Sequence, residues 1–374
     1  MEYIIIFIYA LVMAYRWEKV PCHNRFKIPY YLLFISCILL FGLRYRVGVD
    51  TLNYMYSYVE KPDLSKLTMD YIITSNEAPF YSLLNSVCKS ISSSFYLLQI
   101  VVTIIFNFCL FAFLKRHSVN PFLAFAVFFF MNGLYFNTEI LKESLAVGIF
   151  LVNIDNLFKR RWLKYYLLAT VSLMFHYSAI IVFVFPFFTW LRLNWTFVGL
   201  IVVFFWGSKM LADWLIPMIT FASAANLIDR YTLMLEQDRL NINWIIFALL
   251  QAVLIPLGML IVSRHSKWKL GKYEFLICLC VLLGAGCVYF ELVFQRFTNY
   301  VSIIYAACLA DFFVSHEVKK LFKTAALSAF IVIYTFSYIT HDRFFRWIPY
   351  HSIFNEVKEP AREDIWFDQF GRTD

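Results

Sequence analysis

The stretch YYLLATVSLMFHYSAIIVFVFPFFTWLRL, residues 165–193, is apolar along almost its whole length and carries one histidine, His176, near its middle. A helix that crosses a membrane needs about 20 mainly apolar residues. The stretch is too long for one straight crossing and short for two. We predict two short helices that meet at His176 near a membrane surface. The alternative is one long tilted helix, which would reverse the orientation of everything downstream.

Similar apolar runs fill the rest of the chain. Of its 374 residues, 61% are hydrophobic and 16% charged, with a mean hydropathy of +0.67, whereas soluble domains are about half apolar and a quarter charged. We therefore predict an all-α polytopic membrane protein with about twelve transmembrane helices. Their expected positions are roughly 2–15, 29–43, 94–114, 121–137, 139–158, 163–176, 178–191, 196–215, 243–263, 273–290, 297–315 and 322–340.

The basic residues favour one orientation. With twelve spans, one set of short loops holds 18 of the 33 lysines and arginines, and such loops are usually cytoplasmic. Both termini and the long loops at about 44–93 and 216–242 are then expected outside. Residues 1–340 would form a single transmembrane domain and 341–374 an outward tail. The first run begins with Glu2 where a signal peptide is basic, so we expect it to be retained as a span.

The net charge of +8 is explained by this topology, so no nucleic-acid partner is expected. The eight cysteines have no zinc spacing, and the chain has no HExxH, GxSxG or P-loop pattern. Neither a metal nor another cofactor is predicted.

The outer loops have helical patterns of their own. TLNYMYSYVE, residues 51–60, repeats aromatic and apolar side chains at helical spacing, and Asp50 is a suitable N-cap. LIDRYTLMLEQDRLN, residues 227–241, mixes charge with apolar residues at the same period. We expect both to be short amphipathic helices on the outer membrane face.

Ionisable residues at the borders of the spans converge on the outer side in this topology, and charges against the bilayer core tend to mark function. They lie in five separate pieces of sequence: Arg44 and Arg46; Glu139, Lys142 and Glu143; His176; Asp229, Arg230, Glu236, Asp238 and Arg239; Glu291 and Arg296.

Arg44 and Arg46 have two interpretations. Arginine binds phosphate oxygens bidentately, and the two side chains would share a side if the segment is extended. Gly48 would let the backbone turn close to a ligand. Alternatively, both arginines are membrane anchors that reach to the lipid headgroups. Similarly, Asn137 or Thr138 could cap a helix start that contains Glu139, and Glu139 could pair with Lys142.

Five pieces of sequence also carry a family pattern. LRYRVGVDTLNY, with Arg44 or Arg46, Gly48, Asp50 and Tyr54, resembles the signature near the second span of the EpsG family, the Wzy-like membrane polysaccharide polymerases. Further similar pieces follow in family order: LKESLAVGIFL; His176, Ser178 and Ala179; Arg296, Phe297 and Tyr300; and FRWIPYHSIF with Pro349 and Tyr350. Lys142 and Glu143 depart from the family, which usually has Arg-Gln there.

The resemblance implies a glycosyltransferase of C-type architecture in the bacterial inner membrane, with its active face outward. Members of the family join oligosaccharide units carried on undecaprenyl diphosphate, to make capsule, O-antigen or exopolysaccharide. The growing chain would be transferred to a hydroxyl of the next lipid-linked unit. The implied partners are this lipid-linked oligosaccharide, membrane lipid, and a flippase and chain-length regulator.

On this reading each candidate residue has an expected role. Arg44, Arg46, Arg296 and Lys142 would bind the departing pyrophosphate, although lysine offers a point charge where arginine offers a fork. His176 is the first candidate for accepting the hydroxyl proton because histidine titrates near neutrality, and Asp50 and Glu143 are the others. Tyr54, Tyr58 and Tyr300 would stack on sugar rings.

Two other functions remain open at this point. A ligase or single-addition transferase would use the same donor and give no ladder of chain lengths. A lipid-linked oligosaccharide flippase, which is not an enzyme, should carry charges midway along its spans, whereas here they lie at span ends.

Overall fold

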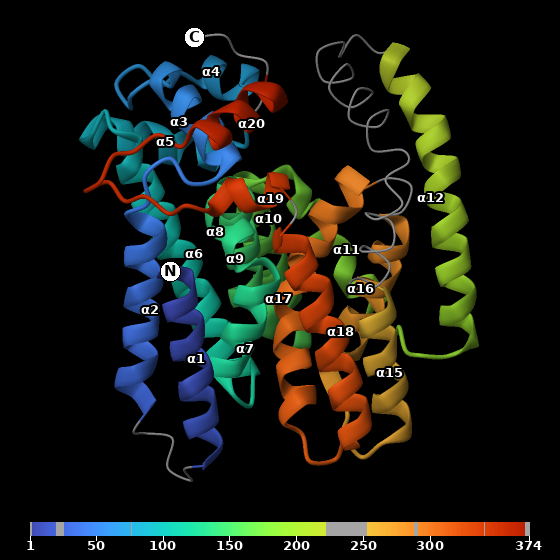
Figure 1. The fold of residues 1–374 in the computed structure, drawn as a ribbon. Helices are drawn as coiled ribbons and strands as arrows, with labels where there is room; N and C mark the ends of the chain where they lie inside the picture. Colours follow the sequence, from blue (N-terminus) through green and yellow to red (C-terminus); the bar gives the residue numbers. More distant parts are fainter. Residues whose placement is uncertain are drawn as a thin grey trace. The chain divides into compact units, whose positions relative to one another are not determined.

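The computed structural model describes residues 2–19, 26–75, 77–221, 253–287, 291–339 and 341–370, and these residues are mainly helical (Figure 1). They divide into two compact units. The first consists of Met1–Val184, Ala306–Val314 and Tyr334–Asp374, and the second of Phe185–Tyr305 and Ser315–Ile333.

The first unit contains a set of long apolar helices. α2 packs beside α6, α6 beside α9, α9 beside α10, and α1 against α2 and α7. Their bounds are α1 (Glu2–Lys19), α2 (Lys27–Gly42), α6 (Phe95–His117), α7 (Pro121–Phe128), α8 (Leu134–Thr138), α9 (Leu141–Phe158), α10 (Trp162–Phe175) and α11 (Ile180–Val184).

Local sequence explains where several of these helices begin and end. The Ser94 side chain caps α6, and Asn120 caps α7, which has a proline at its first position. α6 ends with Lys115, Arg116 and His117, whose charge suits the negative end of the helix dipole. One π-helical turn, η2 (Phe129–Gly133), joins α7 to α8, so residues 121–138 form one continuous helix.

Short helices of the same unit gather at one end of α2 and α6 (Figure 1). They come from the loop after α2 and from the end of the chain: α3 (Val49–Glu60), α4 (Met69–Thr74), α5 (Pro79–Ile91), α19 (His341–Trp347) and α20 (Pro360–Phe370). The helix predicted at 51–60 is therefore confirmed. The helix predicted at 227–241 and the charged residues Asp229, Arg230, Glu236, Asp238 and Arg239 lie outside the described residues.

α3 is capped at both ends by side chains distant in sequence. The backbone N–H groups of Val49 and Asp50 donate to the Glu139 carboxylate at 3.2 and 2.8 Å. At the other end, Lys89 Nζ donates to the carbonyl oxygens of Tyr58, Val59 and Lys61. A carboxylate at the N-terminus and an ammonium at the C-terminus both oppose the helix dipole.

The predicted caps in this region are wrong. The N-cap of α3 is Gly48, and Asp50 lies inside the first turn. Asn137 and Thr138 end α8 instead of capping the next helix, and α9 starts at Leu141. The reason is that Glu139 fills the cap position of α3 from another part of the chain, which local spacing does not reveal.

The helix break predicted at His176 is confirmed. α10 ends at Phe175, and a 3₁₀ turn, η3 (Tyr177–Ala179), separates it from α11. Two residues close this turn: His176 Nδ1 lies 2.6 Å from the Ser178 hydroxyl and also accepts the Ser178 backbone N–H at 3.3 Å.

Most of the twelve apolar runs fall on helices where the structure describes them, but the run at 178–191 is divided into η3, the five-residue α11 and a second 3₁₀ turn, η4 (Phe185–Phe188). Three helices in the described part are long and apolar enough to cross a membrane: Phe95–His117, Pro121–Thr138 and Phe294–Val314. Four further apolar helices are shorter. The protein is thus a helical membrane protein, while the number of twelve spans stays a prediction.

The second unit contains apolar helices of its own. α16 packs against α12 and α15, and Arg192 pairs with Glu274 at 3.4 Å. The described helices of this unit are η4 (Phe185–Phe188), α12 (Trp195–Phe221), α15 (Ile255–His265), η6 (Gly271–Tyr273) and α16 (Glu274–Gly286), together with parts of α17 (Glu291–Val314) and α18 (Lys320–Ile339).

Candidate functional site

Arg44 follows α2 directly, and its guanidinium is fully enclosed by the protein. Nε donates to the carbonyl oxygen of Val47 at 3.2 Å, Nη2 donates to the Thr51 hydroxyl at 3.0 Å, and Nη1 donates to the carbonyl oxygen of Phe41. Burial lowers the pKa of this guanidinium to about 10, so it keeps its charge near neutral pH. In this structure Arg44 joins the end of α2 to the start of α3.

Arg46 has a different environment. Its φ of +49° is left-handed, so the segment is not extended and the condition for both arginines to share a side is not met. Arg46 Nε and Nη2 donate to the two Glu363 oxygens at 2.6 and 2.5 Å, and Nη2 also donates to the Tyr56 hydroxyl at 2.9 Å. The Glu363 carboxylate thus occupies the guanidinium fork, which would also fit a phosphate group.

Gly48, between Arg46 and α3, lies against the end of α8. Its φ is +99°, and a Cβ atom there would lie 2.8 Å from the carbonyl oxygen of Thr138. Its N–H donates to the carbonyl oxygen of Arg346 at 3.0 Å. Only glycine combines this backbone conformation with so close an approach, which explains why the sequence has a glycine at this point.

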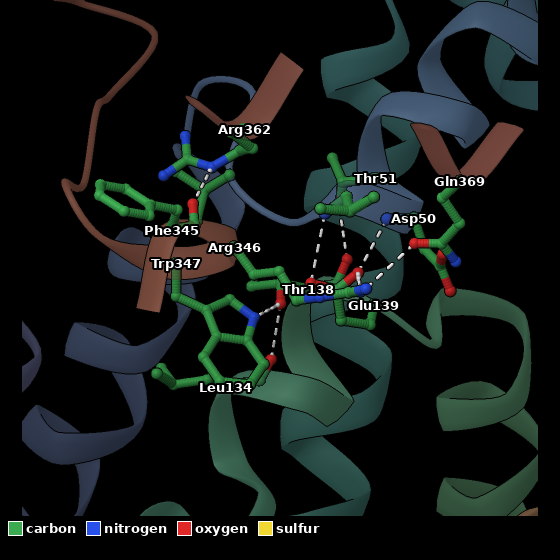
Figure 2. Close-up of polar contacts among 12 residues, drawn as sticks. Asp50, Thr51, Leu134, Thr138, Glu139, Phe345, Arg346, Trp347, Arg362 and Gln369 are labelled. Atoms are coloured by element: carbon green, nitrogen blue, oxygen red, sulfur yellow. Dashed lines mark hydrogen bonds and ion pairs between the residues drawn. The ribbon is translucent and has the colours of Figure 1, made fainter. Parts of the chain in front are cut away.

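Glu139 is the centre of the polar contacts drawn in Figure 2. Besides the two N–H groups of α3, its carboxylate faces Arg346, whose Nη1 lies 3.8 Å from Oε2. Arg346 Nη2 in turn donates to Gln369 of α20 at 3.0 Å. One buried carboxylate therefore joins α3, α19 and, through Arg346, α20.

Thr138, beside Glu139, makes a parallel set of contacts (Figure 2). The carbonyl oxygen of Thr138 accepts the Thr51 hydroxyl. Its hydroxyl accepts Trp347 Nε1 at 2.8 Å and donates to the carbonyl oxygen of Leu134 at 2.8 Å. The segment from α8 to α9 thus fixes α3 from one side and the chain end from the other.

The chain end is also fixed to the Arg46 segment directly. Arg362, which is buried, donates to three backbone carbonyl oxygens: Phe345 at 3.0 Å, Arg46 at 2.9 Å and Pro349 at 2.8 Å. Trp366 stacks on Tyr56 with a ring-centroid distance of 4.5 Å. α20 is therefore packed and hydrogen-bonded against the segment that contains both arginines.

Lys142 lies in a second cluster, which we name the Lys142 cluster and which consists of Tyr54, Lys61, Glu77, Tyr81 and Lys142. Lys142 Nζ lies 5.4 and 5.6 Å from the ring centroids of Tyr54 and Tyr81, and its side chain is 26% exposed. Glu77 lies between the two lysines, 3.4 Å from Lys142 Nζ and 2.9 Å from Lys61 Nζ. The cluster offers a partly exposed cation flanked by two tyrosine rings.

The turn at His176 adjoins this cluster. Tyr177, the residue after His176, donates its hydroxyl to the carbonyl oxygen of Glu77 at 3.2 Å. The structure thus brings together the lysine of α9, a tyrosine of α3 and the bend between α10 and α11, which are three of the separate charged or aromatic pieces singled out from sequence.

The protein-family model of the EpsG family matches residues 27–352. The chain belongs to the EpsG family. Neither the comparison with curated proteins nor that with solved structures gave a match. The suspected resemblance is confirmed, and the matched region contains every candidate site residue.

Two of the EpsG-family pieces lie side by side. Tyr45 N–H donates to the carbonyl oxygen of His351 at 2.8 Å, and Ile353 N–H donates to that of Leu43 at 2.9 Å. The Tyr350 hydroxyl donates to the carbonyl oxygen of Leu40 at 3.0 Å. The first and last pieces of the pattern are therefore paired in space, whereas α20, with Arg362 and Glu363, lies beyond the matched residues.

The other candidate residues of the first unit have distinct positions. Asp50 is half-buried in the first turn of α3, four residues before Tyr54, so both lie on one face of the helix. Glu143 is buried in the first turn of α9. Tyr58 is buried and donates its hydroxyl to the carbonyl oxygen of Ser92 at 3.2 Å.

Arg296 and Tyr300 belong to the second unit, on α17. Arg296 is exposed and Tyr300 is fully buried. The sugar-binding and pyrophosphate-binding roles expected for these and the other candidates stay predictions.

Several structurally important residues were not among the candidates. Glu139 was expected only as a charged residue at a span border, in the first turn of a helix or paired with Lys142, and Lys89 and Arg362 were not singled out. Gln99, which is buried and donates to the carbonyl oxygens of Gly42 and Arg44 at 2.8 and 2.9 Å, was also missed. A polar residue inside the apolar run of α6 was the one available signal, because such residues need partners in a membrane.

Proposed function

We propose that this EpsG-family protein is a polysaccharide polymerase that transfers a glycan from a polyprenyl-diphosphate carrier to a hydroxyl of the next lipid-linked repeat unit. Undecaprenyl diphosphate is the expected carrier, and the outer face of the bacterial inner membrane is the expected location. The polymer would be a capsule, O-antigen or exopolysaccharide. Family membership supports the class of reaction.

The observation that carries the proposal is the meeting of Lys142, Tyr54 and the His176 turn at Glu77. A substrate made of sugars and a diphosphate needs a cation for the phosphates and flat aromatic surfaces for the sugars. The Lys142 cluster offers a partly exposed cation and the half-buried ring of Tyr54. We assign the diphosphate to Lys142 and a sugar ring to the half-buried Tyr54, whose ring packs on the buried Tyr81 at a centroid distance of 6.4 Å.

In the proposed step, the acceptor hydroxyl oxygen attacks the anomeric carbon of the donor glycan. A new C–O bond forms while the bond from that carbon to the phosphate oxygen breaks, and the electron pair leaves with the diphosphate. Lys142 would stabilise the negative charge that develops there, where a preorganised cation contributes most. The hydroxyl proton must pass to a base.

The three candidates for proton transfer, His176, Asp50 and Glu143, differ in chemistry. His176 Nδ1 accepts the Ser178 N–H, which favours the neutral tautomer with its proton on Nε2. In that form Nε2 donates a hydrogen bond, so we assign His176 to the leaving diphosphate. Asp50 shares a helix face with Tyr54, and its carboxylate is the proton acceptor that we propose. Glu143 is buried and is the second choice.

The arginines have supporting roles in this proposal. Arg44 is fully buried and its guanidinium donates to Phe41, Val47 and Thr51, so we propose that it positions the start of α3. Arg46 remains a candidate phosphate ligand, provided that Glu363 releases its guanidinium. Arg296 is exposed on α17 and remains a candidate.

The proposal is tested by deleting the gene and restoring it with variants. A polymerase deletion should accumulate single lipid-linked units on the outer leaflet, a flippase deletion should trap them inside, and a ligase deletion should leave long chains on the carrier.

Lys142→Ala should abolish long chains. Lys142→Arg, which installs the usual family residue, should keep them, and Lys66→Ala, at an exposed site away from the cluster, should change nothing. Normal chain lengths from Lys142→Ala at unchanged protein level would refute the assignment.

A further inference from the structure

α5 has its apolar and polar faces reversed relative to a helix of a soluble protein. Its apolar residues Phe80, Leu83, Val87 and Ile91 are 39%, 40%, 37% and 74% exposed. At about 100° per residue these four positions fall within one narrow stripe of the helix surface. A helix on a water-soluble domain buries such a stripe against the core.

The buried face of α5 is largely polar. Ser82, Asn85 and Ser86 are almost completely buried, beside Tyr81 and Cys88. Tyr81 and Cys88 pack in a cluster with Tyr58 and Phe95. The helix therefore directs hydroxyl and amide groups inward and hydrocarbon outward, an arrangement that is favourable only if something apolar covers the stripe.

The stripe is continuous with apolar membrane helices at both ends. Ile91, its last member, is separated from the candidate span α6 by residues 92–94 only. At the other end the Phe80 ring lies 5.8 Å, edge to face, from Phe175 at the end of the apolar helix α10. Both helices expose apolar side chains of their own, including Phe108 and Leu167.

We infer that α5 lies in the bilayer interface, with the stripe of Phe80, Leu83, Val87 and Ile91 in contact with the acyl chains of membrane lipid. An interfacial helix of this kind sinks its apolar face about 5–10 Å into the boundary between headgroups and acyl chains. Lipid is the occupant because the stripe links two helices whose own apolar surfaces face the membrane.

This position has a consequence for the Lys142 cluster. Tyr81, on the inward face of α5, lies 5.6 Å from Lys142 Nζ. If the outer face of α5 contacts acyl chains, Lys142 is held close to the level of the lipid phosphates. The inference concerns the membrane position of α5 and does not depend on the reaction that the protein catalyses.

The experiment measures the surroundings of a nitroxide on the full-length protein in phosphatidylethanolamine–phosphatidylglycerol vesicles. Leu83→Cys and Val87→Cys place the label on the stripe, and Lys66→Cys, whose side chain is 76% exposed in the loop before α4, is the control. The cysteines in the described part of the chain are buried, and the signal of the labelled unsubstituted protein is subtracted. Oxygen, which partitions into lipid, and a nickel chelate, which stays in water, are the two collision partners.

At positions 83 and 87 we expect oxygen collisions to exceed those of the nickel chelate several-fold, with the reverse at position 66. More frequent collisions with the chelate at 83 and 87 would place the stripe in water and overturn the inference. Infrequent collisions with both reagents would mean that protein covers the stripe, which also overturns it. Ile91→Cys repeats the measurement at the most exposed position of the stripe, in case a label at 83 or 87 disturbs folding.

Discussion

At the residue scale, Glu139 joins segments that are far apart in the sequence. It is 1% exposed and accepts two N–H groups of α3 while facing Arg346. A buried donor left without its acceptor costs roughly 1–3 kcal/mol. Glu139 therefore has a structural role: it holds the motif that follows Arg44 in position.

Glu139→Ala should lower the stability of the protein because the buried N–H of Val49 and the partly buried N–H of Asp50 lose their acceptor. The protein in detergent is heated to a series of temperatures, and the fraction that still elutes as a monodisperse peak in size-exclusion chromatography gives the midpoint of thermal unfolding. Glu60→Ala is the matched control, since Glu60 is an exposed carboxylate at the other end of α3. Equal midpoints for the two variants would contradict the capping role.

Gly48 and Gly271 both need glycine for their backbone conformation, but only at Gly48 would a side chain also collide with a neighbour. Both have positive φ, +99° and +56°, but an added Cβ meets Thr138 at Gly48 and meets nothing within 4 Å at Gly271. A left-handed helical conformation costs a non-glycine residue about 1–2 kcal/mol, and Gly48, with φ +99° and ψ +130°, lies outside even that region. Gly48→Ala should therefore lower the unfolding midpoint more than Gly271→Ala does.

Gly48→Ala and Gly271→Ala can also be compared by the glycan chains that they produce. Gly48→Ala displaces the start of α3, which carries Asp50 and Tyr54, so we expect shorter or fewer glycan chains even at matched protein level. Gly271→Ala should leave chain length unchanged. If both variants behave alike in both measurements, contact with Thr138 is unimportant.

At the scale of elements, α20 is joined to the Arg46 segment by an ion pair, a set of backbone contacts and an aromatic stack. The ion pair with Glu363 is bidentate and nearly buried on the arginine side. Removing one partner of such a pair leaves an uncompensated charge, which is typically more destabilising than removing both. α20 therefore supports the motif although it lies beyond the region matched to the family.

Exchanging the charges of Arg46 and Glu363 distinguishes a structural role of Arg46 from a role in catalysis. Arg46→Glu and Glu363→Arg should each destabilise the protein, and the double variant should recover much of the unfolding midpoint because the pair is restored. If Arg46 also binds the diphosphate, the double variant should still make no long chains. Recovery of both stability and chain length would limit Arg46 to holding α20.

At the scale of the whole molecule, orientation is the property on which the proposed location of the site depends. Lys66 lies in a loop expected outside, and Lys319 lies in a basic loop expected inside. Both residues are exposed. Lys66→Cys should react with a membrane-impermeant maleimide on intact cells, and Lys319→Cys only after permeabilisation. The opposite pattern would place the Lys142 cluster on the cytoplasmic side.

The sequence predicts those features that depend on residues close together in the chain, and it does not predict those that depend on distant residues. Apolar runs and the break at His176 are local, and they agree with the helices. The caps of α3 come from Glu139 and Lys89, and the fork of Arg46 is filled by a carboxylate 317 residues away. Such partners are chosen by tertiary packing, and no spacing rule within one segment contains them.

The meeting of Lys142 with Tyr54 was likewise only partly predictable. Sequence placed both residues on the outer side, but Tyr81 and Glu77, which complete the cluster, come from a loop and helix with no distinctive motif. The left-handed backbone at Arg46 could not be foreseen either, because non-glycine residues seldom adopt it.

The contacts of Arg362 imply an order of assembly during synthesis. The ribosome makes the Arg44–Tyr54 motif early, yet Glu139, Arg346 and Arg362, which hold it in place, follow about 90 to 320 residues later. Until the last helix emerges, the motif lacks several of its contacts. A chain interrupted before residue 360 would lack the contacts of Arg362 with the Arg46 segment, so we expect this motif to take its final position only after α20 has been made.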